Sequence, residues 1–187
     1  FYWRNVKRFL TMNKSLICLS AVAMGLMSIN VANAANATGT LTVKATITNS
    51  CVLNTSATGT TSNAILDFGT LSSLASNVDA DTTTTGGTAI KVLCNNTVPW
   101  TLAFDAGKNA QSTQRRMIGG AASNEYIPYN LFSDTNRATA IGIATTAYSG
   151  TGTGAAQTVN VYGRIPAGST LPSAGSYVDT VTVTVTY

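Results

Sequence analysis

Residues 177–187 read YVDTVTVTVTY, and this stretch decides the fold class. Valine and threonine alternate in it from Thr180 to Thr186, so every second side chain there is apolar and those between are polar. Successive side chains of a β-strand point to opposite faces, and β-branched residues are favoured in strands. The stretch therefore predicts a strand whose apolar face carries Tyr177, Val181, Val183, Val185 and Tyr187.

A second alternating stretch, residues 40–48, reads TLTVKATIT and lies toward the other end of the chain. Its apolar face carries Leu41, Val43, Ala45 and Ile47, and only Lys44 adds a charge. Proteins usually protect an exposed apolar strand with charge or proline, so an unprotected one is suited to joining the sheet of another molecule. Two interpretations follow. Either both stretches are ordinary strands of one closed sandwich, or both lack a partner within the chain and pair with the complementary stretch of another copy.

Alternation recurs between these two stretches, and no long segment shows the 3.6-residue apolar period of a helix. Glycine-rich breaks and polar clusters separate the alternating segments, which is typical of an antiparallel sandwich. The runs at 82–85 and 150–154 are predicted to be surface loops. Strands are predicted at 40–48, 51–55, 65–68, 88–94, 100–105, 115–118, 126–133, 158–165 and 176–187.

The composition excludes several kinds of catalytic site. The 187 residues include no histidine, which removes Ser-His-Asp and Cys-His nucleophile pairs and HExxH zinc sites. A glycosidase pair drawn from Asp67, Asp105, Glu125 and Asp134 stays open, but no pattern sets two of these side chains together. We therefore expect no enzyme, no catalytic residue, no cofactor and no bound metal.

Residues 12–34 have the order of a secretory signal. Met12-Asn13-Lys14 forms a basic start, residues 16–29 are apolar, and small residues end at Ala34. The expected organisation is an upstream extension plus signal peptide at 1–34, cleaved after Ala34, then an arm at 35–48 and one β-sandwich domain at 49–187. Cleavage after Ala37 is an alternative, as is a membrane anchor at 16–31, although a span needs ~20 apolar residues.

Charge is balanced after the expected cleavage site. Four of the 11 Lys and Arg residues precede residue 15, which leaves seven against the 7 acidic residues. Binding to nucleic acid relies on clustered positive charge, so nucleic acid is not an expected partner.

Two cysteines remain once the leader, with Cys18, is removed. An even number of cysteines in an exported protein predicts a disulfide, here between Cys51 and Cys94. The competing interpretation is a thiolate or metal pair, which no histidine or further cysteine supports.

Four segments occur in an informative order: ATGTLTVKATITNSC at 37–51, DFGTL at 67–71, IKVLC at 90–94 and GSYVDTVTVTV at 175–185. In order and spacing the chain resembles the spore coat protein U family. That family holds the subunits of archaic (Csu-type) chaperone-usher pili of Gram-negative bacteria. The resemblance covers essentially the whole segment after the leader.

The resemblance implies an incomplete immunoglobulin-like antiparallel β-sandwich, completed by a donor strand from the neighbouring subunit. Implied partners are identical or related pilin subunits in a head-to-tail polymer, a periplasmic pilus chaperone and an outer-membrane usher. The implied location is an extracellular cell-surface pilus that serves adhesion and biofilm formation, and a single domain implies a rod subunit. The implied donor residues are Leu41, Val43, Ala45 and Ile47; the implied last strand of the acceptor groove carries Tyr177, Val181, Val183, Val185 and Tyr187.

The alternative function is a monomeric secreted carbohydrate-binding β-sandwich module. Its sugar-stacking platform would come from aromatic side chains, although such residues more often fill the core of a sandwich. Arg115 and Arg116 are adjacent on a predicted strand, so they point to opposite faces and are expected in surface ion pairs rather than in an anionic-glycan site. The candidate platform residues are Trp100, Tyr126, Tyr129, Tyr148 and Tyr162.

Overall fold

The computed structural model describes residues 36–53 and 63–187, and within them the chain forms strands and no helix. The predicted leader at 1–34 lies outside the described residues. Contacts divide the chain into the units Phe1–Lys44 and Ala45–Tyr187, and every described strand belongs to the second. The strands are β1 Cys51–Leu53, β2 Val78–Asp81, β3 Ile90–Cys94, β4 Pro99–Phe104, β5 Arg115–Gly119, β6 Glu125–Phe132, β7 Thr146–Thr151, β8 Ala156–Val159, β9 Tyr162–Ile165, β10 Tyr177–Val178 and β11 Val183–Thr186.

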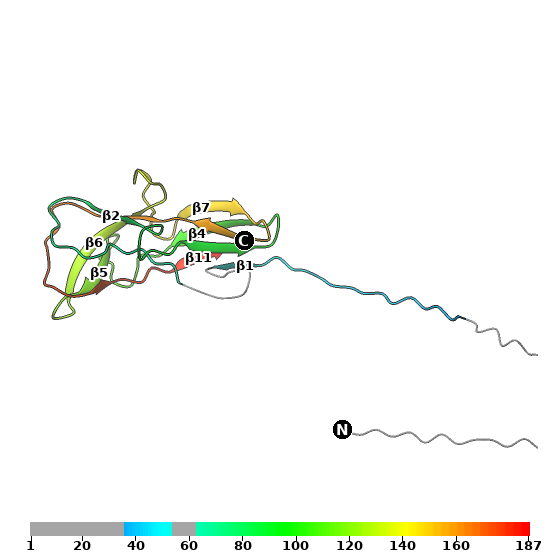
Figure 1. Cartoon of the computed structure of the whole chain (residues 1–187). Helices are drawn as coiled ribbons and strands as arrows, with labels where there is room; N and C mark the ends of the chain where they lie inside the picture. The colour runs from blue at the N-terminus through cyan, green and yellow to red at the C-terminus, as the bar shows by residue number, and fades with distance from the viewer. Residues whose placement is uncertain (1–35, 54–62) are drawn as a thin grey trace, which may run out of the picture. The chain divides into compact units, whose positions relative to one another are not determined.

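The described strands pair only in the antiparallel sense, as the sequence predicts. Three sheets have the orders β1-β3-β8, β10-β5-β6-β9-β2 and β11-β4-β7. In Figure 1, β5 and β6 lie at one end of the sandwich, and β4, β7 and β11 lie at the other. The fold class is therefore an all-β antiparallel sandwich.

Two segments pass from one sheet to another, which divides two predicted strands. The strand predicted at 158–165 becomes β8 and β9, and the one predicted at 176–187 becomes β10 and β11. At the first division the Val161 amide donates to the Thr82 hydroxyl, and the Val161 carbonyl accepts from the Thr82 amide, both at 3.0 Å. The chain thus changes sheets without leaving this buried backbone unpaired.

The core is built from the inward faces of β3, β4, β6 and β9. Ile90, Leu102 and Ile165 are almost completely buried, and Trp100 packs beside them in the same apolar cluster. Alternation along β4 places its even-numbered residues inside, as period-two patterning requires.

Two strands were absent from the sequence-based prediction, and a predicted loop was partly wrong. β2 has the polar sequence VDAD, and β7 ends inside the glycine run that predicts a loop at 150–154. Gly150 pairs with Trp100 of β4, and a β-carbon at Gly150 would lie 2.4 Å from Trp100 Cζ2. Here glycine marks close packing inside a strand rather than a turn.

The segments predicted at 40–48 and 65–68 do not form ladders within the chain. Residues 40–48 carry no strand, and 65–68 contributes only the bridge between Ile65 and Thr88. A strand needs a neighbour to bond with, so alternation alone does not create one. The strands predicted at 51–55, 88–94, 100–105, 115–118 and 126–133 are confirmed to within two residues, as far as they lie in the described part.

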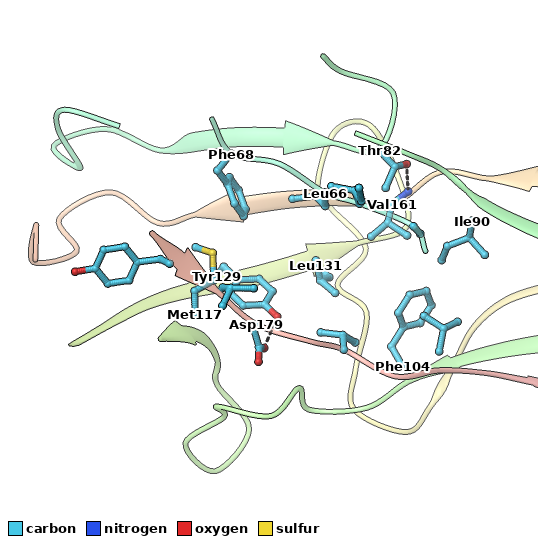
Figure 2. A pocket seen from close by; sticks show the side chains of 16 residues that line it. Leu66, Phe68, Thr82, Ile90, Phe104, Met117, Tyr129, Leu131, Val161 and Asp179 are labelled. Carbon is cyan, nitrogen blue, oxygen red and sulfur yellow. Dashed lines mark hydrogen bonds between the residues drawn. The ribbon is translucent and has the colours of Figure 1, made fainter. Parts of the chain in front are cut away.

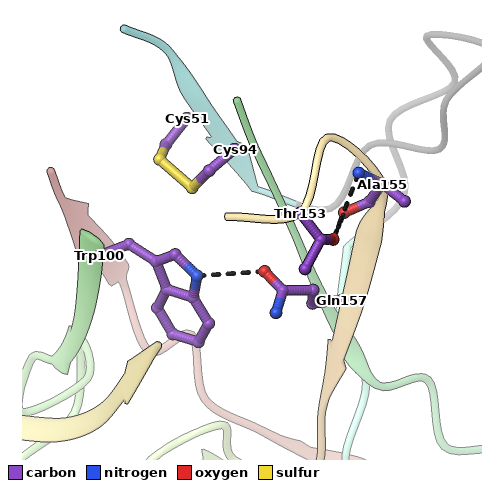
Figure 3. Close-up of a disulfide and its surroundings, with 6 residues drawn as sticks. All are labelled: Cys51, Cys94, Trp100, Thr153, Ala155 and Gln157. Carbon is purple, nitrogen blue, oxygen red and sulfur yellow. Dashed lines mark hydrogen bonds between the residues drawn. A yellow bond between two sulfur atoms is a disulfide. The ribbon is translucent and has the colours of Figure 1, made fainter. Parts of the chain in front are cut away.

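The predicted disulfide between Cys51 and Cys94 is confirmed, and Figure 3 shows it close to Trp100. Cys51 begins β1, Cys94 ends β3, and the two face each other in the β1–β3 register. The Asn95 amide donates to the Ser50 carbonyl at 3.0 Å, which extends this attachment by one residue. The disulfide therefore fixes the point where the chain enters the sandwich.

The tail, defined here as residues 177–187, crosses between two sheets through residues 179–182, which form no regular ladder. Asp105 Oδ1 accepts from the amides of Thr182 and Gly107, both at 2.8 Å. Asp179 Oδ1 accepts from the Lys108 amide at 3.0 Å and from Asn109. These two carboxylates replace the missing ladder and hold the crossing in place.

Arg115 supports this crossing from beneath and is only 5% exposed. Its guanidinium donates to the carbonyls of Asp105, Ile141 and Gly142 at 2.8 to 3.1 Å. The expected surface ion pair is therefore wrong for Arg115, because backbone carbonyls take up its donors. Arg116 points to the other face, as predicted, where it lies 4.0 Å from the centre of the Tyr126 ring.

The disulfide predicts two protected cysteines in the folded, exported protein. Alkylation without reduction should leave the intact mass unchanged, and reduction should make both Cys51 and Cys94 reactive. Because the bond closes a loop of 43 residues, reducing it should lower the free energy of unfolding by ~4 kcal/mol in the chain-entropy model. A free thiol at either position in folded material would contradict the pairing.

The crossing predicts an acid-sensitive contribution from Asp105. Burial raises the pKa of Asp105, but hydrogen bonds from Thr182 and Gly107 outweigh it and leave the pKa below its ordinary value. A lowered pKa stabilises the folded state above the unfolded value of ~3.9, and this stability is lost as pH falls through the folded pKa.

Asp105→Asn should therefore lower the free energy of unfolding by about 1–3 kcal/mol at pH 7, since hydrogen bonds to a charged acceptor are lost. The difference between wild type and variant in urea denaturation should shrink below pH 4. A constant difference from pH 7 to pH 2.5 would show that the carboxylate charge contributes nothing.

Candidate functional site

The tail is hydrogen-bonded along one edge only. β10 pairs with β5 and β11 pairs with β4, and among the described strands nothing pairs with the opposite edge of either. From Tyr177 to Thr186 the odd-numbered residues are half-buried and the even-numbered ones are exposed. The tail therefore presents a free row of main-chain donors and acceptors beside a row of inward-facing side chains.

A cavity of about 220 Å³ lies along this free edge, and Figure 2 shows the side chains that surround it. One wall is the tail, with Tyr177, Val181 and Val183. The opposite wall is the segment 63–71, in which the even-numbered Ala64, Leu66 and Phe68 are half-buried. Phe104, Tyr129 and Leu131 from β4 and β6 also line the cavity.

A second cavity of about 620 Å³ continues beyond Tyr177. It lies between residues 66–74 and residues 171–177, with Ile127 of β6 also in its lining. Leu66, Phe68, Met117 and Tyr177 line both cavities, so the two adjoin. We call the combined feature the groove.

A polar contact lies inside the first cavity of the groove, whose other lining side chains are mostly apolar. The Tyr129 hydroxyl donates to Asp179 Oδ2 at 2.7 Å, as Figure 2 shows. Burial, together with this hydrogen bond, raises the pKa of Tyr129 above its ordinary value, so the phenol stays neutral and remains a donor. The contact ties β6 to the tail.

The far end of the groove is fastened by Glu125, Ser173 and Tyr177. Glu125 Oε2 accepts from the Tyr177 hydroxyl and the Ser173 amide, both at 3.0 Å, and also from the Ser173 hydroxyl. These hydrogen bonds lower the pKa of Glu125. The loop that ends at Tyr177 is thereby attached to the start of β6.

The described part of the arm, residues 36–48, has the opposite character to the groove. All of its residues are exposed and none lies in a strand. Leu41, Val43 and Ile47 are 88%, 84% and 83% exposed. These are the largest exposed fractions among the exposed large hydrophobic residues of the described chain, so the arm offers an apolar face without a partner.

The structure places the sequence-predicted tail residues in different positions. Tyr177, Val181 and Val183 line the groove, and Val185 is half-buried against the core. Tyr187 follows the end of β11 and is 57% exposed, so it is not among the residues that line the groove. The strand pairing ends at Thr186, one residue before Tyr187.

Sequence reasoning missed most of the groove outside the tail. Met117, Ile127 and Tyr129 come from β5 and β6, far from the tail in the sequence, and only the strand pairing brings them together. The wall at 63–71 was predicted in part, as a strand at 65–68, and in the structure Ala64, Leu66 and Phe68 alternate there with exposed residues.

The four carboxylates considered for a glycosidase pair each accept hydrogen bonds from nearby groups. Asp67 accepts from the Gly69 amide and Asp134 from the Thr139 amide, while Asp105 and Glu125 hold the tail as described. They serve turns and attachments rather than a shared site. Within residues 36–53 and 63–187, no group of three His, Cys, Asp or Glu side chains could hold a metal ion.

The aromatic residues considered for sugar stacking are mostly inside. Trp100 and Tyr129 are buried, Tyr148 and Tyr162 are half-buried, and only Tyr126 is exposed, with Arg116 over its ring.

No helix long and apolar enough to cross a membrane occurs among the described residues.

Comparison with known proteins identifies the family. The chain matches the Spore Coat Protein U domain over residues 37–184. It is 31% identical over 180 residues to Protein U of Myxococcus xanthus, which covers 93% of this chain and 98% of that protein.

A solved structure is also similar: the CsuC–CsuE chaperone–tip adhesion subunit pre-assembly complex from the archaic chaperone-usher Csu pili of Acinetobacter baumannii. The similarity has a TM-score of 0.48 at 20% identity and covers 76% of this chain but only 40% of that chain. From the match to the domain over most of its length, we conclude that the chain belongs to the Spore Coat Protein U domain family.

Proposed function

We propose that this protein is a structural subunit of an extracellular pilus rod, in which the arm of one copy fills the groove of the next. The observation that carries the proposal is the coexistence, in one chain, of an apolar groove beside a free strand edge and an exposed segment with strand alternation. Each feature is unfavourable alone, and each supplies what the other lacks. In this proposal the arm begins at residue 35 and the sandwich domain spans 49–187.

The two partners match in chemistry and length. An inserted arm would bond to the free edge of the tail, while Leu41, Val43, Ala45 and Ile47 would face the groove together. The arm from 37 to 47 has as many residues as the tail from 177 to 187, and at ~3.4 Å per residue each spans roughly 35 Å. Side-chain parity lets one face of the arm enter while its threonines stay outside.

The free energy of inserting the arm into the groove favours a link that lasts because it dissociates slowly. Burying three aliphatic side chains contributes about 5–9 kcal/mol, at ~1.5–3 kcal/mol each. Ordering the arm costs ~1–2 kcal/mol per residue, which the main-chain ladder must help to offset. Durability would then depend on slow extraction of the strand, because ladder and apolar contacts must break together.

Such subunits need assembly proteins that protect the groove and the arm, and membership of the family supports a chaperone and an usher in this role. An open groove and an exposed apolar arm both favour uncontrolled association. We propose that a periplasmic chaperone covers the groove first and that an outer-membrane usher exchanges it for the next arm. The joint is head-to-tail, so repetition gives a filament on the cell surface, suited to adhesion and biofilm formation.

The alternative of a monomeric carbohydrate-binding module has no supporting observation, since most of its candidate aromatic residues are buried or half-buried.

Side-chain parity in the arm predicts which substitutions stop polymerisation. Val43→Asp or Ile47→Asp should abolish polymer, because a carboxylate in an apolar groove costs several kcal/mol unless it is protonated. Thr42→Asp and Thr46→Asp are the matched controls. These residues face away from the groove in an inserted arm, so the two variants should polymerise nearly normally. The measurement is co-expression with chaperone and usher, followed by scoring denaturant-resistant ladders and the chaperone-bound subunit.

The same experiment separates donor defects from folding defects. Chaperone-bound subunit should persist in all four variants, because the chaperone occupies the groove and does not need the arm. Equal damage from odd-numbered and even-numbered substitutions would mean that the arm does not fill a groove. Harmless odd-numbered substitutions would favour the closed, monomeric module.

Salt should have little effect on the assembled filament. The segment after the expected cleavage site carries equal numbers of acidic and basic residues, and the groove-facing arm residues are uncharged. Salt at ~1 M screens exposed charges and leaves buried strands in place. Sedimentation of filaments in 0.05 M and 1 M salt should recover the same pellet, and dissolution at high salt without denaturant would exclude strand insertion as the main linkage.

A further inference from the structure

The groove is not uniform along its length. Its two cavities adjoin at four large side chains, Leu66 and Phe68 from one wall and Met117 and Tyr177 from the other. We call these four residues the constriction. In Figure 2, Phe68 and Leu66 lie on one side, and Met117 and Tyr129 lie opposite.

The side chains of the constriction have little room to retreat. A β-carbon on Gly163 would lie 2.9 Å from Leu66 Cδ2 and 2.9 Å from Phe68 Cζ, so both side chains already rest on the bare backbone of β9. Phe68 also packs on Tyr129, with ring centroids 6.4 Å apart. On the other wall, the Tyr177 hydroxyl is held by Glu125 and by the Ser173 carbonyl.

The arm contains one small residue among its four groove-facing positions. Leu41, Val43 and Ile47 have branched side chains, whereas Ala45 has only a methyl group. Groove-facing residues of a strand recur every ~7 Å, so the residues on either side of Ala45 are displaced by about that distance along the groove. A strand with Ala45 over the constriction would place Val43 in one cavity and Ile47 in the other.

We propose that Ala45 of one subunit seats at the constriction of the next and that its size fixes the register of the inserted arm. This inference rests on the proposed function and adds to it a residue that determines specificity. It holds for either direction of the inserted strand, because Ala45 lies between two larger groove-facing residues. Slipping the arm by two residues keeps the parity but drives Val43 or Ile47 against the four large side chains.

The test uses a size exchange between donor and acceptor. The acceptor is the full chain carrying Val43→Asp and Ile47→Asp, so that its own arm does not compete, and the donor is a fluorescent synthetic peptide of residues 36–50. The acceptor is refolded with the peptide, and the rate of peptide release is measured by fluorescence anisotropy. Far-UV circular dichroism checks that each acceptor variant folds.

Ala45→Leu in the peptide should speed release at least tenfold, although it adds apolar surface. Thr46→Leu, which adds apolar surface to the outward face, is the matched control and should change release less than twofold. An acceptor with Met117→Ala should release the Ala45→Leu peptide at least fivefold more slowly than the unchanged acceptor does. Val183→Ala, which enlarges the groove away from the constriction, should give no such rescue.

Two results would overturn the register and one would overturn the proposed function. If the Ala45→Leu peptide is held as long as the wild-type peptide, or if Val183→Ala rescues it as well as Met117→Ala does, Ala45 does not sit at the constriction. Both outcomes leave arm insertion intact, since the wild-type peptide binds. Failure of the wild-type peptide to bind a folded acceptor would reject arm insertion itself. Should Met117→Ala not fold, Phe68→Ala makes room at the same constriction and gives the same expectation.

Discussion

The tail of the chain is hydrogen-bonded along one edge only, and much of the structure is arranged around that free edge. Unpaired main-chain groups and inward-facing valines both call for one more strand at the same place. Backbone groups that lie out of water without partners are costly, and so are apolar side chains left in water. One inserted strand satisfies both requirements, which is why the arm and the groove are more informative together than either is alone.

Keeping such an edge straight requires support where the tail changes sheets. Residues 179–182 have no ladder, and Asp105 and Asp179 accept hydrogen bonds from the amides of Thr182 and Lys108 instead. Gly107 belongs to the same arrangement, because a β-carbon there would lie 2.1 Å from Asp179 Oδ2. Beneath them, buried Arg115 binds carbonyls from two separate loops. These polar contacts at residues 179–182 thus hold β10 and β11 together along one side of the groove.

The sequence predicted what depends on local alternation and missed what depends on long-range packing. The tail and the arm are visible because apolar residues alternate with threonine at 180–186 of the tail and with threonine or Lys44 at 40–48 of the arm. β2 and β7 escaped prediction because their side chains are short or polar and their strand state depends on β9 and β4. In the site, the tail residues were predictable, whereas Met117 and Tyr129 enter the groove only through the pairing of β5 with β6.

Tyr187 illustrates a limit of the same reasoning. Its parity matches that of Val183 and Val185, yet the ladder with β4 ends at Thr186 and the ring is left exposed. Parity states which face a side chain would take if the strand continued, and it carries no information on where pairing stops. The end of a strand is set by its neighbour.

The outward faces of the arm and the tail share one composition, and this has a physical consequence. Threonine occupies positions 40, 42, 46 and 48 of the arm and 180, 182, 184 and 186 of the tail. Threonine is β-branched, so it favours the extended backbone, while its hydroxyl keeps that face compatible with water. An arm built in this way is biased toward strand geometry before it finds a partner, which lowers the entropy lost on insertion. The same choice limits the exposed apolar surface to a single face, so a free arm can be captured correctly only by a groove that accepts that face.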